Sequence, residues 1–287
     1  MGDVLLEEGQ IWLYIFVVLL LALSSIQGVT ADTSDSTSVN LTIGNTAPNI
    51  DYVATVGAQD AVAAGNVEIH INFTANDMDG LGDLVNASAM VRLIGGVTDS
   101  PGYNERYSLC TAASWNDSAI NYTCVVVLWY FDAPGTWEIN VTINDTGGVK
   151  VEDQSGSVVL NPLTAMDLED NNITFGNISG GQTVGASNSP MEVLNRGNVN
   201  ATTFTMNATD LLSPTGIIGA GNFTMNENDS AVGNATRLGN ETYAILSWGN
   251  ITVGNDTREE IYTYVAIPSG LPKENYASRR NWELTLA

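Results

Sequence analysis

The sequence predicts an all-β protein with two antiparallel β-sandwiches in tandem, preceded by an N-terminal hydrophobic helix. Several segments alternate apolar and polar residues with a period of two, which is typical of half-buried strands. Gly, Pro, Asn and Asp separate these segments and mark turns. No helical periodicity interrupts them, and 287 residues are enough for two domains that each bury a core.

The first sandwich is expected over residues 41–162, after a polar linker at 32–40 (residues 32–38 read DTSDSTS). The clearest alternation is VEIHINF at 67–73, and TWEINVTI at 136–143 repeats it. A strongly apolar run at 122–130 suits a central strand. The remaining strands of this domain are expected at 89–93 and 157–160.

The second sandwich is expected over residues 163–287. Its strongest strand candidates are YAILSW at 243–248 and IYTYVAI at 261–267, because aromatic and β-branched residues dominate both. Weaker candidates are expected at 173–176, 191–194, 203–207 and 282–286.

Residues 1–31 carry an export signal or an anchor. Ile11–Leu23 is almost continuously apolar and is followed by a polar stretch and a small-residue cleavage pattern ending at Ala31. The preceding residues include Asp3, Glu7 and Glu8 and no positive charge, so the positive-inside rule does not predict the orientation of this segment. The segment is therefore a cleaved signal peptide, an uncleaved anchor that contacts the membrane through residues 11–26, or the helical core of a filament.

N-glycosylation sequons are unusually dense. The N-x-S/T pattern occurs 17 times among 30 Asn residues, whereas random placement would give about 5. Glycans require exposed positions in exported proteins, although Thr-rich strands also generate sequons incidentally. The sequons are Asn40, Asn72, Asn86, Asn116, Asn121, Asn140, Asn144, Asn172, Asn177, Asn200, Asn207, Asn222, Asn228, Asn234, Asn240, Asn250 and Asn255.

Cysteine and charge content agree with an exported chain. The only two cysteines, Cys110 and Cys124, are expected to form a disulfide that staples a hairpin or a long loop. The net charge of −23 arises from 32 acidic and only 9 basic residues. Because phosphate binding needs Lys and Arg, the composition excludes nucleic-acid binding and favours divalent cations as small partners.

The turn signatures of the first sandwich are similar to those of a known group. NTAPNI at 45–50, FTANDMDG at 73–80 and DAPGTW at 132–137, with Val141 and Asp145, resemble Ig-like domains of archaeal cell-surface proteins. In the second sandwich, Phe175-Gly176, NRGNV at 195–199, PSGL at 268–271 and Tyr276 look like a further module of such proteins, found in small-genome archaea. The resemblance implies an extracellular, tandem Ig-like fold, an archaeal source and no catalysis.

One acidic loop has the composition of a cation site. Asp77, Asp79 and Asp83 place three carboxylates on one turn, and Gly80 and Gly82 allow the backbone to turn tightly. Ca²⁺ requires six to eight oxygen ligands, of which such a loop supplies several. The EF-hand pattern is not met because no Glu stands at its twelfth position. The alternative is a solvated acidic turn, and no other cofactor is expected.

No enzyme signature is present. The single histidine, His70, lies in an alternating strand and is expected to be a face residue of a sheet. No nucleophile elbow, Walker A or zincin motif occurs, and no particular pair of carboxylates is selected for glycoside hydrolysis. Core packing is expected for Trp129, Trp137, Trp248 and Trp282, and exposure for Trp115.

These observations predict an exported, glycosylated, non-enzymatic protein at the cell surface, with a structural or adhesive role. One alternative is a subunit of an extracellular filament or pilus, assembled through residues 1–31 or by donation of a strand from 32–44. A further alternative is a module that binds glycans or other surface proteins through loops such as 95–117.

Overall fold

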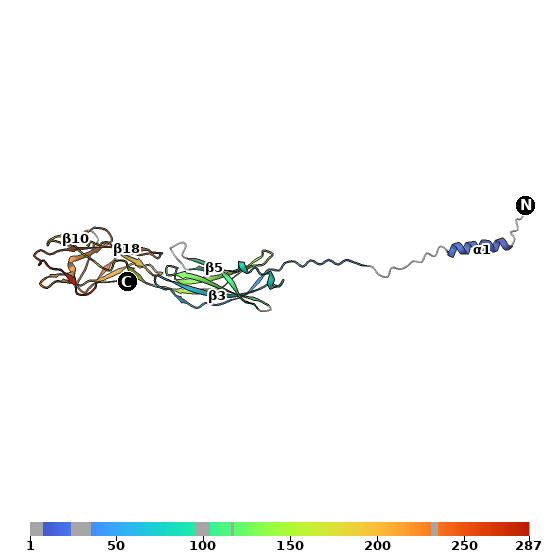
Figure 1. The fold of residues 1–287 in the computed structure, drawn as a ribbon, viewed down its shortest axis with the longest axis horizontal. Coiled ribbons are helices and arrows are strands. Elements are labelled where there is room, and N and C mark those ends of the chain that lie inside the picture. The colour runs from blue at the N-terminus through green and yellow to red at the C-terminus, as the bar shows by residue number, and fades with distance from the viewer. Residues whose placement is uncertain (1–7, 24–35, 96–103, 116–117, 231–234, 287) are drawn as a thin grey trace. The chain divides into compact units, whose positions relative to one another are not determined.

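A computed structural model of the chain describes residues 8–23, 36–95, 104–115, 118–230 and 235–286 (Figure 1). The chain divides into two units, Met1–Gly44 and Asn45–Ala287. Helix α1 (Glu8–Leu23) belongs to the first unit, and the apolar side chains of residues 12–21 are exposed on it. Among the described residues, no helix combines the length and the apolar character needed to cross a membrane. The predicted cleavage pattern at 29–31 lies outside the described residues.

The second unit is built of strands, which confirms the all-β class. The first module is an eight-stranded sheet in the order β1-β3-β6-β5-β4-β7-β8-β2. Its strands are β1 (Asn49–Val53), β2 (Gln59–Asp60), β3 (Asn66–Asn76), β4 (Met90–Gly95), β5 (Glu105–Trp115), β6 (Ile120–Trp129), β7 (Gly135–Asn144) and β8 (Lys150–Asn161), with short 3₁₀ helices η1 (Leu81–Asp83) and η2 (Asn86–Ser88) between β3 and β4.

Strand β5 gives this module its two layers. Its first half, residues 105–109, pairs with β4, and its second half, residues 110–115, pairs with β6. Strand β1 at one end of this order also approaches β8, which is next to the other end. A Cβ atom added to Gly156 in β8 would lie 3.1 Å from the Cγ1 atom of Val53 in β1. The sheet therefore closes over a core of its own.

The core of the first module contains the inward side chains of these alternating strands. Ile69, Ile71 and Phe73 of β3 are buried, whereas His70 and Asn72 between them are exposed. Phe73 stacks on Tyr122 of β6 with ring centroids 4.9 Å apart. This is the geometry that a period-two pattern requires when one face of a sheet is solvated.

The second module is made of shorter strands. They form a six-stranded sheet, a three-stranded sheet of β17, β12 and β20, and a three-stranded sheet of β14, β13 and β19. The strands are β9 (Met166–Leu168), β10 (Thr183–Gly185), β11 (Met191–Asn195), β12 (Phe204–Asn207), β13 (Leu211–Leu212), β14 (Ile217–Ile218), β15 (Phe223–Asn226), β16 (Thr236–Arg237), β17 (Tyr243–Leu246), β18 (Arg258–Ala266), β19 (Ala277–Ser278) and β20 (Glu283–Leu286), with a 3₁₀ helix η3 (Ala220–Asn222).

Strand β18 organises the larger sheet, because it pairs with β10, β11 and β15. A separate core surrounds Phe204, Phe223 and Val193, which are at most 1 % exposed. The segment expected as a strand at 173–176 has no strand pairing. Its apolar residues Ile173 and Phe175 instead pack at the edge of this core, so their apolar character reflects burial without strand pairing.

Two further expectations need correction. Residues 105–115, expected within a loop at 95–117, form strand β5, because Tyr107, Leu109 and their neighbours complete hydrogen-bonded ladders with β4 and β6. Among the tryptophans, Trp137 is fully buried and Trp115 is 68 % exposed, as expected, but Trp129 is 43 % exposed and stacks on Phe131 outside the core.

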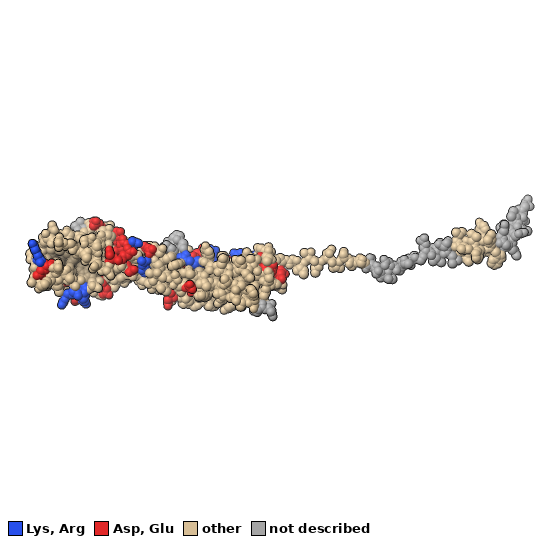
Figure 2. Space-filling view, in the orientation of Figure 1, with Lys and Arg blue, Asp and Glu red and all other residues tan. Residues whose placement is uncertain are grey.

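Most of the visible face of residues 45–287 carries neither Lys/Arg nor Asp/Glu side chains (Figure 2). On the outward face of β3, β6 and β5, Glu68 is charged, whereas the rows farther along the strands are not. Across these strands the rows Thr74–Asn121–Ser114 and Asn72–Thr123–Thr111 consist entirely of uncharged polar residues. The net negative charge of the chain thus reflects a shortage of Lys and Arg, on a surface rich in side-chain amides and hydroxyls.

Candidate metal centre

The three aspartates singled out from the sequence lie together at one end of the first module. Asp77 follows directly after β3, Asp79 lies in the next turn, and Asp83 closes the 3₁₀ helix η1. One carboxylate oxygen from each lies within 4.8 Å of the others. Gly80 has a φ of +112°, which favours glycine. Gly82 lies inside η1 and is not among the glycines with a positive φ.

Each of the three carboxylates has an oxygen held by a protein donor. The backbone N–H of Asp79 donates to Oδ1 of Asp77, with a distance of 2.9 Å. The hydroxyl of Thr146 donates to Oδ1 of Asp83. The backbone N–H of Thr46 donates to Oδ2 of Asp79 at 2.6 Å. Donors of this kind orient carboxylates around a metal ion, and here they come from three separate segments of the chain.

The second oxygens of Asp77 and Asp83 have no donor. Asp77 is 7 % exposed, and its Oδ2 atom and that of Asp83 are buried without a hydrogen-bond partner. An unsatisfied buried polar atom costs about 1–3 kcal/mol, and more when the group is charged. Two such atoms in one cluster indicate a missing positively charged partner.

No basic side chain supplies that partner in the described part of the chain. The ion pairs found there involve other carboxylates, such as Glu105, Asp132 and Asp256. Three carboxylates at this separation repel each other. A divalent cation would satisfy both orphaned oxygens and remove the repulsion. The oxygen-only donor set suits a hard ion such as Ca²⁺, with water or backbone carbonyls completing its six to eight ligands.

A second layer of contacts surrounds the loop. Asp145, at the end of β7, is 2 % exposed. The side-chain amide of Asn45 donates to its Oδ2 at 2.9 Å and the backbone N–H of Val149 donates to its Oδ1 at 2.8 Å. These donors, Asn45 first, hold the pKa of Asp145 below its usual value. The next residue, Thr146, donates its N–H to the carbonyl of Asp83 at 2.8 Å.

Sequence reasoning found the three acids but missed the residues that orient them. Thr46 and Thr146 lie 33 and 63 positions from their carboxylate partners, and no local spacing links them. The turn motif NTAPNI at 45–50 contains Thr46 and is the local signal that bears on it.

The expected disulfide between Cys110 of β5 and Cys124 of β6 is formed. The two residues face each other across the ladder, with Cα atoms 4.2 Å apart. The bridge therefore staples two neighbouring strands where β5 passes from one layer to the other.

The structure separates the sequons by accessibility. Of the 15 described sequon asparagines, 10 are exposed, four (Asn121, Asn144, Asn207 and Asn222) are half-buried, and Asn140 is buried. Asn116 and Asn234 lie outside the described residues. Asn140 in β7 is 7 % exposed, and its side-chain oxygen has no donor.

His70 lies on an exposed face of the sheet, as expected from the sequence. Its Nε2 atom is 3.8 Å from the carboxylate of Glu68.

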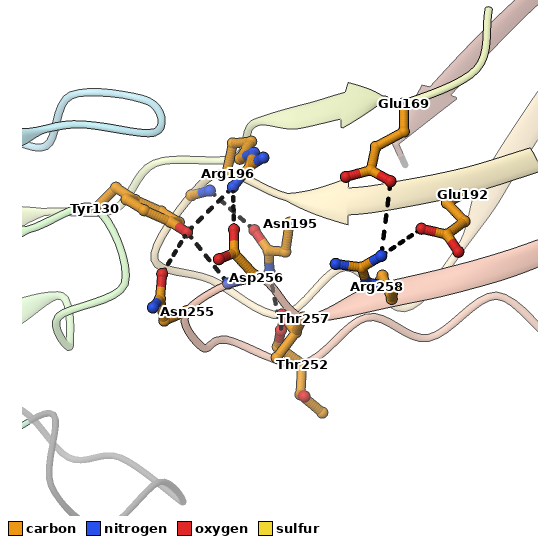
Figure 3. A network of polar contacts seen from close by, with 11 residues as sticks. Tyr130, Glu169, Glu192, Asn195, Arg196, Thr252, Asn255, Asp256, Thr257 and Arg258 are labelled. Carbon is orange, nitrogen blue, oxygen red and sulfur yellow. Dashed lines mark hydrogen bonds and ion pairs between the residues drawn. The ribbon is translucent and has the colours of Figure 1, made fainter.

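A second polar network joins the two modules (Figure 3). The hydroxyl of Tyr130, just after β6, donates to Oδ1 of Asn255 at 3.3 Å and accepts a hydrogen bond from the N–H of Asp256 at 3.3 Å. Arg196 forms an ion pair with Asp256 at 2.6 Å, and its carbonyl accepts the N–H of Ala64 at 3.1 Å. The network connects strand ends of the two modules.

No protein-family model matches the chain, and comparison with curated proteins gives no match.

Proposed function

We propose that the chain is an exported, glycosylated and non-enzymatic surface protein with a structural or adhesive role, whose first module is stabilised by Ca²⁺. The observation that carries export is the Cys110–Cys124 disulfide, since such bridges persist in oxidising compartments. The 10 exposed sequon asparagines support glycosylation, because oligosaccharides need accessible amide nitrogens.

The topology of the first module supports an Ig-like identity. One layer holds β1, β3, β6 and the second half of β5, and the other holds β7 and β8 with β4 and the first half of β5. This arrangement corresponds to the ABED and CFG sheets of Ig domains with one added edge strand. The short β2 pairs in parallel with β8 at the open edge. The disulfide departs from the antibody pattern because it joins neighbouring strands instead of the two sheets.

A filament or anchor role for the N-terminal segment is the second candidate. The observation that favours it is α1, on which Trp12, Phe16 and Leu20 are each more than half exposed. Such side chains are stable in water only when lipid or other copies cover them.

Mass spectrometry of protein purified from its native source tests these proposals. We expect glycopeptides at exposed sequons and a mass that shows no free thiol. Two free thiols together with unmodified sequons would contradict export. A mature N-terminus at Asp32 would leave secretion as the role of residues 1–31, and retention of Met1 would favour the anchor or filament.

A further inference from the structure

The chain enters the first module directly beside the candidate metal centre. Residues 36–47 are exposed and have no regular secondary structure, and Pro48 is the first buried residue after them. Two contacts hold the entry segment, which we define as Asn45–Pro48. Thr46 donates its N–H to Asp79 at 2.6 Å, and Asn45 donates its amide to Asp145 at 2.9 Å.

The second contact is closely packed. A Cβ atom on Gly147 would lie 2.8 Å from the amide carbon of Asn45, so the β7–β8 turn has room for this side chain only because residue 147 is glycine. Asn45 is therefore positioned by packing as well as by its hydrogen bond, and this contact does not involve the cation cluster.

The first contact depends on Asp79, the one exposed member of the cluster. Asp77 is buried and Asp83 is half-buried, whereas Asp79 is exposed and has room to rotate toward solvent. With three negative charges close together and no cation, electrostatic repulsion favours that rotation. A rotated Asp79 no longer accepts the hydrogen bond of Thr46. A bound cation reverses the preference, because Asp79 becomes a ligand.

We propose that Ca²⁺ binding by Asp77, Asp79 and Asp83 locks the entry segment onto the first module through the Asp79–Thr46 hydrogen bond. The inference rests on the cation site of the proposed function, and it adds a mechanical consequence. The Ca²⁺ concentration determines whether Thr46, which follows the independently held Asn45, is held against the module or released. The buried, unpartnered Oδ2 atom of Asp77 is the observation that points to a ligand inside this cluster.

Hydrogen exchange at the amide of Thr46 measures this coupling in the full chain. If the Thr46 amide exchanges only when the cation has been released, its exchange slows by about 100-fold at a Ca²⁺ concentration of about 100 times Kd. Isothermal calorimetry with CaCl₂ gives Kd independently. Mg²⁺ is expected to produce a smaller response, because it demands strict octahedral geometry and gives up its waters reluctantly.

Two variants separate binding from coupling. Asp83→Asn removes a ligand that does not touch the entry segment, and we expect it to abolish both the calorimetric heat and the slowing at Thr46. Thr46→Pro removes the N–H donor but no carboxylate, so calorimetric Ca²⁺ binding persists while the Asp79–Thr46 hydrogen bond is lost. Glu68→Gln, which removes one charge from an exposed face of the same module, is the matched control and responds as the wild type does.

The outcomes are distinguishable. Heat of binding with no change in exchange at Thr46 would overturn the coupling and leave the cation site intact. No heat in the wild type would overturn the site and the coupling together. Neither result bears on export or glycosylation, which the mass of the native protein tests separately.

Discussion

Thr123 donates its hydroxyl hydrogen to the side-chain oxygen of Asn72 across strands β6 and β3, with 2.8 Å between Oγ1 and Oδ1. The register places Asn72 opposite Thr123 and Thr74 opposite Asn121. Two sequons, at 72–74 and 121–123, therefore run antiparallel beside each other on one exposed face. The hydroxyl that completes the second sequon orients the asparagine of the first.

This pairing predicts unequal modification of the two sites. The Asn72 side chain is exposed and uses its oxygen in the contact, so its amide nitrogen remains available. Asn121 is half-buried, and its amide nitrogen donates to Ser114 at 2.8 Å. We expect high glycan occupancy at Asn72 and low occupancy at Asn121, measured by glycopeptide mass spectrometry. The buried Asn140 serves as an internal negative control. An abundant glycan on Asn140 would contradict the expectation that side-chain accessibility determines occupancy.

Ca²⁺ is expected to raise the thermal stability of the first module. A ligand at about 100 Kd adds about 2.7 kcal/mol to the free energy of unfolding, which corresponds to roughly 10 °C in Tm for a domain of this size. Asp77→Asn is expected to lose this increase. In EDTA the same variant should be at least as stable as the wild type, because one repelling charge is gone. Calorimetric melting curves with and without Ca²⁺ decide the point.

Removal of the disulfide should destabilise the first module. Closing a loop of this length contributes about 3 kcal/mol, mainly by restricting the unfolded chain. We expect the double variant Cys110→Ala/Cys124→Ala to lose about that amount in urea denaturation. Reduction of the wild type should have a comparable effect, and the double variant should not respond to reductant. A double variant as stable as the oxidised wild type would show that the bridge adds no constraint.

Asp132 makes stability depend on pH. Its side chain is fully buried, and burial raises its pKa to about 6, although the N–H of Trp129 and the guanidinium of Arg106 both lower it. The folded state therefore binds this proton more tightly than the unfolded state, in which an aspartate titrates near 3.9. The associated stabilisation, about 3 kcal/mol, is complete below pH 3.9 and is lost as the pH rises through about 6.

The variant Asp132→Asn isolates this effect. The free energy of unfolding of the wild type minus that of the variant should fall as the pH rises from 4 to 7, because only the wild type titrates. Urea denaturation across this range measures the difference. A difference that grows with pH would mean that the attraction of Arg106 outweighs burial.

The hydroxyl of Tyr130 should contribute modestly to the connection between the modules. Tyr130→Phe removes its contacts with Asn255 and Asp256 while leaving the ring in place. We expect a loss of about 1 kcal/mol in the free energy of unfolding. Tyr52→Phe, at a position that is 58 % exposed, is the control and should change stability by less than half as much. Equal effects of the two substitutions would assign no role to the contacts.

Strand prediction succeeded where apolar and polar residues alternate along a strand. Alternation revealed β3, in which exposed residues separate the buried ones, and β7, although its polar residues Asn140 and Thr142 are themselves buried. It failed for β5, in which Tyr107, Leu109 and Trp115 are exposed although they are apolar. The pattern also predicted a strand at 173–176, where Ile173 and Phe175 pack against the core of the second module without pairing with another strand. In both cases the decisive information was a neighbour distant in sequence.

The sequence by itself determined the all-β class, the cysteine pair and the three acids of one loop, because each follows from the pattern or the identity of residues close together in the chain. Only the tertiary structure decided which donors orient those acids, that two carboxylate oxygens are buried without a partner, and which sequons face solvent. Thr46, Thr146 and Asp83 converge because the start of β1, the segment after β3 and the β7–β8 turn lie at the same end of the module. Such convergence depends on strand register, which is a property of the whole sheet.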